Sequence, residues 1–497
     1  MTIISPVSYT HLDVYKRQYE GSADNIFENV SFQMDTDWRL GFTGRNGRGK
    51  TTFLKLLMGQ YEYSGTISAS VDFEYFPYDV KNRDDFTIDV VRQTAPAAED
   101  WQIARELSLL DAEDILYQQF DTLSYGEQTK ALLAGLFLRE NLFLLIDEPT
   151  NHLDIDGRRR LAEYLSRKKG FILVSHDRAF LDGCIDHVLA VNRMDIEVQK
   201  GNFSSWMENK MRREQFEYAE NEKLQKDIRR LSDSARQSSS WSDKVEKSKK
   251  GATNSGSKLD RGYVGHRAEK MMKRSKSLEN RREQMIAEKQ KLLKNLERQD
   301  ALKIIPLKFH SSRLLELSDV SIHYGDIPAA QGISFTVEQG ERVVLSGKNG
   351  SGKSSVLKLI CRQPIPYDGT VMQNQQLIVS YVPQSGDGLK GSLREYAALR
   401  GIEEHLLKSY LRKFDFSREQ FEQNMEHFSS GQKKKVLLAA SLCERAHLYV
   451  WDEPLNYIDV FSRMQLEELI QEFQPTLLFV EHDRVFCDKI ATKTVRL

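Results

Sequence analysis

The chain has 497 residues, too many for one hydrophobic core, and at roughly 100–200 residues per domain this predicts about two to four domains. Its 71 Lys and Arg residues balance 72 Asp and Glu residues to a formal net charge of −1, which at first argues against a nucleic-acid partner. The four cysteines lie far apart in the sequence, which excludes a disulfide scaffold and a zinc ribbon and indicates a reducing compartment. No run of about 18 apolar residues exists, so no transmembrane helix is expected.

The first eighteen residues differ in character from the rest of the chain. Back-translation of Val7–Gln18 gives DNA that is almost its own reverse complement and resembles two abutting transposon mosaic ends used to prepare sequencing libraries. We therefore predict that residues 1–18 are a non-native, adapter-like segment and exclude them from fold reasoning. The alternative is an unusual native strand and turn.

Three motifs occur twice in the same order, separated by nearly constant offsets of 303, 305 and 306 residues. The pairs are Gly44–Thr51 with Gly347–Ser354, Leu142–Pro149 with Leu448–Pro454, and Ser175–Asp177 with Glu481–Asp483. The first pair fits the phosphate-loop pattern, which is Gly, four residues, and then Gly-Lys-Ser/Thr. Three ordered motifs at one offset predict two copies of a nucleotide-binding domain.

Each copy has the sequence pattern of an α/β domain. Short apolar runs at Arg39–Thr43 and Arg342–Ser346 precede the glycine loops, and apolar residues at helical spacing follow them. Phe171–Val174 and Leu477–Val480 are continuous apolar runs, which are typical of strands in a parallel sheet covered on both faces. Strand, glycine loop and helix form the context in which the phosphate-loop motif is credible.

The glycine loops are predicted to bind ATP. Glycine lets backbone N–H groups approach the phosphates, the lysine places an ammonium on the β- and γ-phosphates, and the hydroxyl that follows can ligate Mg²⁺. The predicted residues are Gly44, Arg45, Asn46, Gly47, Gly49, Lys50, Thr51 and Thr52 in the first copy, and Gly347, Lys348, Asn349, Gly350, Gly352, Lys353, Ser354 and Ser355 in the second.

The later motifs supply acids and a histidine at strand ends. The aspartate is predicted to hold Mg²⁺, the adjacent glutamate to polarise the attacking water, and the histidine to contact the γ-phosphate. The two sets are Asp147, Glu148 and His176, and Asp452, Glu453 and His482. The alternative is a structural turn with a buried acidic pair, which two complete sets disfavour.

One further short motif lies between the glycine loop and the acidic motif of each copy, at Leu123–Gln128 and at Phe428–Gln432. Both resemble the signature motif of the ATP-binding cassette (ABC) superfamily. The resemblance implies two cassettes that sandwich two ATP molecules head to tail within one monomer. Its implied ATP contacts are Ser124, Gly126, Glu127, Ser429, Ser430, Gly431 and Gln432. Both motifs depart from the family at the third position, where Tyr125 and Ser430 stand.

The resemblance also implies a glutamine that senses the metal and an aromatic ring that stacks on adenine. Gln384 matches the glutamine, but the first copy has Tyr78 at this position, so the two sites are expected to hydrolyse ATP at different rates. Tyr19 and Tyr324 match the adenine-stacking aromatic residue. If the first eighteen residues are foreign, the native sequence resumes at Tyr19 and lacks the strand expected before it.

The connector between the copies is basic. Residues 205–300 contain 25 Lys and Arg against 16 Asp and Glu, a net of +9, which leaves −10 elsewhere. Apolar residues at heptad-like spacing predict two long helices in an antiparallel hairpin, with a mobile tip at about 238–265 rich in Ser, Gly and Lys. Such a basic probe favours RNA, and the alternative is a charged spacer.

Two cassettes, no membrane span and a charged helical linker resemble the ABC-F family, with finer likeness to its Lsa-type antibiotic-resistance members. This implies a cytoplasmic, Mg²⁺-dependent ATPase that binds the ribosome, contacts rRNA and tRNA through the linker, and protects the peptidyl-transferase centre from antibiotics. The alternatives are a housekeeping ABC-F translation factor and the tandem ATPase subunit of a membrane importer. The predicted domains are 19–205 and 311–497 for the cassettes and 206–310 for the linker.

Overall fold

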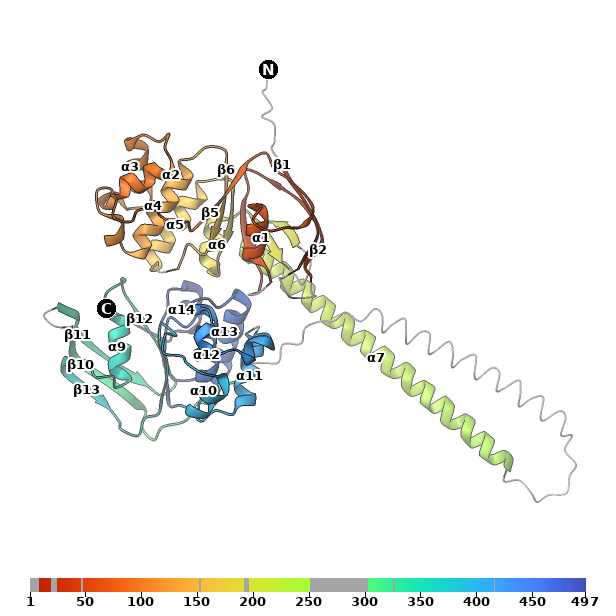
Figure 1. Cartoon of the computed structure of the whole chain (residues 1–497). Coiled ribbons are helices and arrows are strands. Elements are labelled where there is room, and N and C mark those ends of the chain that lie inside the picture. The colour runs from red at the N-terminus through yellow and green to blue at the C-terminus, as the bar shows by residue number, and fades with distance from the viewer. Residues whose placement is uncertain are drawn as a thin grey trace, which may run out of the picture. The chain divides into compact units, whose positions relative to one another are not determined.

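The computed structural model describes residues 9–18, 25–45, 48–151, 153–191, 196–250, 303–324, 327–414 and 416–497. The chain divides into two compact units, one formed by residues 1–206 with 300–497 and the other by residues 207–299. The first unit holds both predicted cassettes. Each of them repeats the same order of strands and helices, as expected from the paired motifs (Figure 1).

The first cassette begins with two antiparallel strands and then alternates strands with helices. Its elements are β1 (Tyr9–Gln18), β2 (Asn25–Asp35), β3 (Arg39–Thr43), α1 (Lys50–Leu57), β4 (Ser64–Ser68), β5 (Asp72–Phe76), α2 (Thr87–Thr94), α3 (Asp100–Leu109), α4 (Tyr125–Phe137), β6 (Leu142–Asp147), α5 (Ile155–Ser166), β7 (Phe171–Val174), α6 (Arg178–Cys184), β8 (His187–Val191) and β9 (Ile196–Lys200). Short 3₁₀ turns at Glu113–Ile115 and Phe120–Thr122 lead into α4.

The second cassette follows the same plan. Its elements are β10 (Arg313–Tyr324), β11 (Ile327–Glu338), β12 (Arg342–Ser346), α9 (Lys353–Ile360), β13 (Tyr367–Gln373), β14 (Val379–Val382), α10 (Leu393–Leu399), α11 (Glu404–Lys413), α12 (Ser430–Cys443), β15 (Leu448–Asp452), α13 (Val460–Phe473), β16 (Leu477–Val480), α14 (Arg484–Ile490) and β17 (Lys493–Arg496). Short 3₁₀ turns at Glu419–Glu422 and Met425–His427 precede α12.

The central sheets have the predicted parallel pairing. In the described residues the strand order is β5-β6-β7-β3-β8-β9 in the first cassette, where only β9 runs antiparallel, and β14-β15-β16-β12-β17 in the second. Every residue of β7 and β16 is buried, which confirms that their unbroken apolar runs lie between covered faces. This arrangement confirms the α/β fold and brings the ends of β3, β6 and β7, and of β12, β15 and β16, to one edge.

The segment predicted to be foreign forms a strand. Residues 9–18 make β1, which lies between β2 and β4 in antiparallel pairing, just as β10 lies between β11 and β13 in the second cassette. The first cassette therefore has a strand at this position, and the foreign origin of residues 1–18 stays a prediction. Backbone hydrogen bonds between strands do not depend on side-chain identity, so a sequence of other origin can occupy this position.

The connector begins with one helix that is longer than predicted. Helix α7 spans Phe203–Lys250, so residues 238–250, expected as the start of an irregular tip, are helical (Figure 1). The reason is local, because no Gly or Pro interrupts the chain before Gly251. The second helix of the predicted hairpin and the rest of the tip fall outside the described residues.

The end of the predicted linker belongs to the cassette unit. Ile304 is buried among the apolar residues of α11 and α12, and the Leu307 N–H donates to the Ala446 carbonyl at 2.8 Å. The compact unit therefore resumes at residue 300 rather than at the predicted residue 311. Among the described helices, none combines the length and apolar content needed to cross a bilayer.

Candidate nucleotide-binding and hydrolysis sites

Both glycine loops end in a left-handed glycine that starts a helix at the motif lysine. Gly49 has a φ of 86° and Gly352 a φ of 84°, and α1 and α9 begin at the next residue. A Cβ on Gly352 would lie 2.4 Å from the Ala329 carbonyl oxygen, so only glycine fits there. The first turns, which include Thr51, Thr52, Ser354 and Ser355, point their backbone N–H groups toward the loop, as anion binding requires.

The motif lysines lie inside their own loops. Lys50 Nζ donates to the Gly44 carbonyl at 2.7 Å and to the Arg45 carbonyl at 3.2 Å. Lys353 Nζ donates to the carbonyls of Gly347 and Lys348, each at 2.8 Å. Burial lowers the pKa of both lysines. Each ammonium is thus held inside the loop that would surround a phosphate, and Gly350, with a φ of 83°, shapes the turn of the second loop.

The motif aspartates end β6 and β15 beside the hydroxyl of the loop. The Thr51 hydroxyl donates to Asp147 Oδ2 at 3.3 Å, and the Tyr75 hydroxyl donates to the same oxygen at 2.8 Å. In the second cassette, neither carboxylate oxygen of Asp452 has a hydrogen-bond partner of good geometry among the described residues, and both are buried. Burial raises the pKa of Asp452 to about 6, against the effect of the nearby Ser354 hydroxyl.

These residues fit a magnesium ion. A buried carboxylate without a donor is stabilised by a cation, and a carboxylate with a hydroxyl is the protein share of the shell that Mg²⁺ completes with water and phosphate oxygens. Thr51 and Asp147 would hold it in the first cassette, and Ser354, Asp452 and Gln384 in the second. When bound, the ion would neutralise charge on the phosphates.

The glutamates after the aspartates have a strained backbone and pKa values shifted in opposite directions. Glu148 and Glu453 have φ values of 50° and 48°, and their N–H groups donate to the carbonyls of Val174 and Val480. Burial, aided by the charge of Asp147, raises the pKa of Glu148 to about 8. Burial also disfavours the ionised form of Glu453, but the hydrogen bond and charge of His482 lead the effects that lower its pKa to about 2.

The histidines face these glutamates. His176 Nε2 lies 3.4 Å from Glu148 Oε1, and His482 Nε2 lies 3.7 Å from Glu453 Oε1. Burial lowers the pKa of His176 well below its usual range, which keeps this imidazole neutral. The two predicted triads of aspartate, glutamate and histidine are therefore each brought together at one sheet edge.

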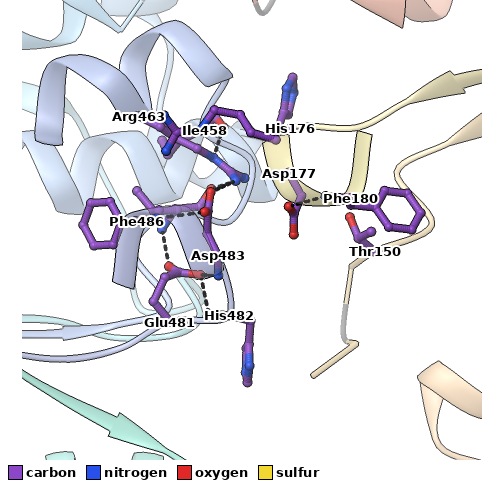
Figure 2. A network of polar contacts seen from close by, with 12 residues as sticks. Thr150, His176, Asp177, Phe180, Ile458, Arg463, Glu481, His482, Asp483 and Phe486 are labelled. Carbon is purple, nitrogen blue, oxygen red and sulfur yellow. Dashed lines mark hydrogen bonds and ion pairs between the residues drawn. The ribbon is translucent and has the colours of Figure 1, made fainter. Parts of the chain in front are cut away.

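A buried ion pair fixes the residue after each histidine. Asp483 accepts from the Phe486 N–H at 3.0 Å, which caps α14, and pairs with Arg463 at 3.0 Å (Figure 2). Asp177 caps α6 in the same way and pairs with Arg158 at 2.9 Å. These arginines were missed by the sequence reasoning, although their separation of 305 residues matches the offset of the motifs.

The signature motifs form helix N-caps. Ser124 and Ser429 cap α4 and α12, and each accepts from the backbone N–H of the third residue that follows. That third residue turns its side chain back to the cap, so Glu127 accepts from the Ser124 N–H at 2.9 Å and Gln432 from the Ser429 N–H at 2.8 Å. Glu127 and Gln432 are thus engaged in capping boxes, which a Ser-x-x-Glu/Gln pattern predicts.

The remaining predicted residues divide into placed and unplaced ones. Gly126, Ser430 and Gly431 lie in the first turns of α4 and α12, and Asn349 lies in the second glycine loop. Gln384 Nε2 donates to Glu453 Oε1 at 2.9 Å, whereas the Tyr78 hydroxyl lies 2.8 Å from Thr94 Oγ1. Tyr324 is exposed at the end of β10. Asn46, Gly47 and Tyr19 fall outside the described residues.

Comparison with known proteins agrees with this geometry. The family model described as ABC transporter matches residues 27–151 and 330–456, one stretch in each cassette. The ribosome protection protein VmlR of Bacillus subtilis is 30% identical over 490 residues, which cover 95% of this chain and 84% of VmlR. The chain belongs to the ABC-F family of ATPases.

This ABC-F protein also resembles relatives with other names. The energy-dependent translational throttle protein EttA of Haemophilus influenzae is 24% identical over 522 residues, with 94% of this chain and 88% of EttA covered. The solved structure of the archaeal ribosome recycling factor aABCE1, in complex with the stalk protein aP1, matches with a TM-score of 0.63 at 19% identity. That match covers 97% of this chain and 87% of the other and supports the tandem-cassette fold.

Proposed function

We propose that this ABC-F ATPase is a cytoplasmic, Mg²⁺-dependent enzyme that binds the ribosome and protects its peptidyl-transferase centre from antibiotics. The observation that carries the proposal is a 48-residue helix, α7, that follows the first of two ATPase cassettes in a chain 30% identical to a ribosome protection protein. The net charge of +9 on residues 205–300 suits a phosphate backbone, so rRNA and tRNA are the proposed contacts of the linker.

In the proposed reaction, Lys50 and Lys353 hold the β- and γ-phosphates of two ATP molecules. Glu148 and Glu453 orient the attacking water, and His176 and His482 contact the γ-phosphate. The geometry supports these roles. In each cassette the glutamate carboxylate lies close to the histidine ring, at the same edge of the sheet as the glycine loop.

We further propose that the two cassettes of one monomer close on both ATP molecules, with each signature motif opposite the other glycine loop. Two charged groups of the second cassette support this proposal. Burial is the main cause that lowers the pKa of Lys50, and the carboxylate of Asp459 opposes it. Burial raises the pKa of Glu148, and Arg463 opposes that shift. ATP-driven closure would align the linker, and hydrolysis would release it.

Ribosome co-sedimentation tests the proposal. A chain with Glu148→Gln and Glu453→Gln binds ATP without hydrolysing it, so it should stay on ribosomes when ATP is present. The matched control is Glu163→Gln with Glu468→Gln, which changes two exposed glutamates at equivalent positions on α5 and α13. The proposal is wrong if the catalytic variant sediments free of ribosomes under these conditions.

A housekeeping translation factor is the second candidate, favoured by the likeness to EttA. Expression in a susceptible host separates the two functions, because only a protection protein should raise tolerance to lincosamides, streptogramin A or pleuromutilins. A third candidate, the ATPase subunit of a membrane importer, predicts that deletion of residues 238–265 is harmless. Loss of drug tolerance on that deletion, with ribosome binding retained, would favour protection over the other two.

A further inference from the structure

Lys434 is a buried lysine that the proposed reaction does not use. It lies on α12, five residues after Ser429, and only 2% of its surface is exposed. Its ammonium makes three contacts, with the carbonyl oxygens of Asp452 at 2.6 Å, Pro383 at 2.8 Å and Gln384 at 3.3 Å. A lysine ammonium has three N–H donors, so these three acceptors satisfy it completely.

The three acceptors belong to two separate segments of the second site. Pro383 and Gln384 follow β14, whereas Asp452 ends β15 and is followed by Glu453. Lys434 therefore joins the backbone at Pro383 and Gln384, just after β14, to the end of β15. The side chain of Gln384 also donates from Nε2 to Glu453 Oε1 at 2.9 Å. Lys434 thus holds the backbone of the residue that makes this hydrogen bond.

The first cassette provides an internal comparison. Its residue at the equivalent position, five after Ser124, is Thr129, which has no ammonium to offer. There the glutamine is also absent, because Tyr78 stands in its place and turns its hydroxyl toward Thr94. The cassette that has the metal-sensing glutamine is thus the cassette that has the buried lysine.

We propose that Lys434 is a positioning residue of the second site, which fixes the loop of Gln384 against the acidic strand so that Gln384 can act on Mg²⁺ and Glu453 together. This inference rests on the proposed function of that site. Burial lowers the pKa of Lys434 to about 8, and the charge of Asp452 opposes the shift, so the side chain keeps its three protons at neutral pH.

The test is steady-state ATP hydrolysis by the full chain as a function of Mg²⁺ concentration. Lys434→Met should lower turnover and raise the Mg²⁺ concentration for half-maximal rate, each by about tenfold, since residues behind a metal site typically change activity by 10–100-fold. Gln384→Ala should have the same effect, and the double variant should be no worse than either one, because the lysine acts through the glutamine. Nucleotide binding measured without Mg²⁺ should not change.

Two further variants separate positioning from folding. Lys433→Met removes the neighbouring lysine of the same helix and should leave the Mg²⁺ dependence unchanged. Lys434→Thr introduces the residue of the first cassette and should reproduce the Mg²⁺ defect. Its free energy of unfolding should fall, because three carbonyls lose their buried donor, and a cooperative unfolding transition verifies that the chain still folds.

The possible results are distinct. Unchanged Mg²⁺ dependence in both Lys434 variants, or effects of Lys434→Met and Gln384→Ala that multiply in the double variant, would overturn the inference while the proposed function stands. If the unaltered chain shows no Mg²⁺-dependent hydrolysis, the proposed function itself is wrong and the inference is overturned with it.

Discussion

Gln384 and Glu453 are joined by a hydrogen bond of 2.9 Å, from the amide Nε2 to the carboxylate Oε1. Asn456 Nδ2 donates to the other carboxylate oxygen at 2.6 Å, so both oxygens of Glu453 have donors. Glu148 differs, because its Oε1 is buried without a hydrogen-bond partner in the described part of the chain. The two sites are therefore chemically unequal, with an ionised carboxylate in the second and a protonated one in the first at neutral pH.

The unequal glutamates predict unequal pH profiles. A general base must be deprotonated, so hydrolysis by the first site should rise as the pH passes through about 8, the pKa of Glu148. The general base of the second site should contribute no such rise near pH 8, because Glu453 has a pKa of about 2 and stays ionised. Single-turnover hydrolysis by chains with Glu453→Gln or Glu148→Gln isolates the first and second site respectively. Identical profiles in the two variants would contradict the assignment.

A pair of equivalent tyrosines gives the second prediction. The Tyr75 hydroxyl donates to Asp147 Oδ2 at 2.8 Å, but the Tyr381 hydroxyl, at the equivalent position, is buried without a partner among the described residues. Tyr75→Phe should lower the apparent Mg²⁺ affinity of the first site by about tenfold, as expected when a partner of a metal-binding carboxylate is lost.

The equivalent change in the other cassette is the control. Tyr381→Phe removes a hydroxyl that makes no hydrogen bond to any described residue, so it should leave activity unchanged and raise the free energy of unfolding by about 1 kcal/mol or less. Mg²⁺ titration of ATP hydrolysis and denaturant unfolding measure the two effects. A loss of activity in Tyr381→Phe that equals the loss in Tyr75→Phe would show that the hydrogen bond to Asp147 is not the cause.

The catalytic residues could be predicted because their motifs combine fixed spacing with a repeat. Lys50, Glu148 and His176 are far apart in sequence, but each follows an apolar strand, and parallel strands bring their carboxyl ends to one edge. Arg158 could not be predicted from a motif, since an arginine on an amphipathic helix is ordinarily a surface residue. Its structural role becomes visible only in the ion pair with Asp177, the residue that caps α6.

The linker boundaries were harder to predict, for physical reasons. The helical spacing in α7 is clear, but serine-rich composition at 238–250 does not end a helix unless Gly or Pro is present. At the other end, Lys303–Lys308 has the composition of a short strand or connector, and only its packing against α11 and α12 assigns it to the second cassette. Tertiary packing of this kind leaves no periodic signal in so short a segment.

That corrected boundary gives the third prediction. Ile304 is 1% exposed and Ile305 is 55% exposed, so neighbouring residues of one type offer a matched comparison. Ile304→Ala should lower the free energy of unfolding by about 2–5 kcal/mol, the usual effect of deleting a buried isoleucine side chain. Ile305→Ala should change it by less than about 0.5 kcal/mol. Equal changes in the free energy of unfolding for the two variants would show that residues 303–310 belong to the linker and not to the second cassette.

The buried pair of Arg463 and Asp483 gives the last prediction. The Asp483 carboxylate has no exposed surface, and it both caps α14 and accepts from Arg463 Nη1 at 3.0 Å. Arg463→Met would leave that charge buried without its partner, so the free energy of unfolding should fall by about 3–5 kcal/mol. His482 directly precedes Asp483, the residue that caps α14, so turnover should also fall because the imidazole loses its fixed position next to Glu453.

An exposed arginine at the start of α14, the helix that Asp483 caps, is the control for that change. Arg484 pairs with Asp488 at 3.5 Å, and both side chains are 72% exposed, so Arg484→Met should change the free energy of unfolding by less than about 1 kcal/mol. Denaturant unfolding and ATP hydrolysis are measured on both variants. If Arg463→Met keeps full stability but loses turnover, the arginine acts on the nucleotide rather than through Asp483, and the ion pair is not what positions His482.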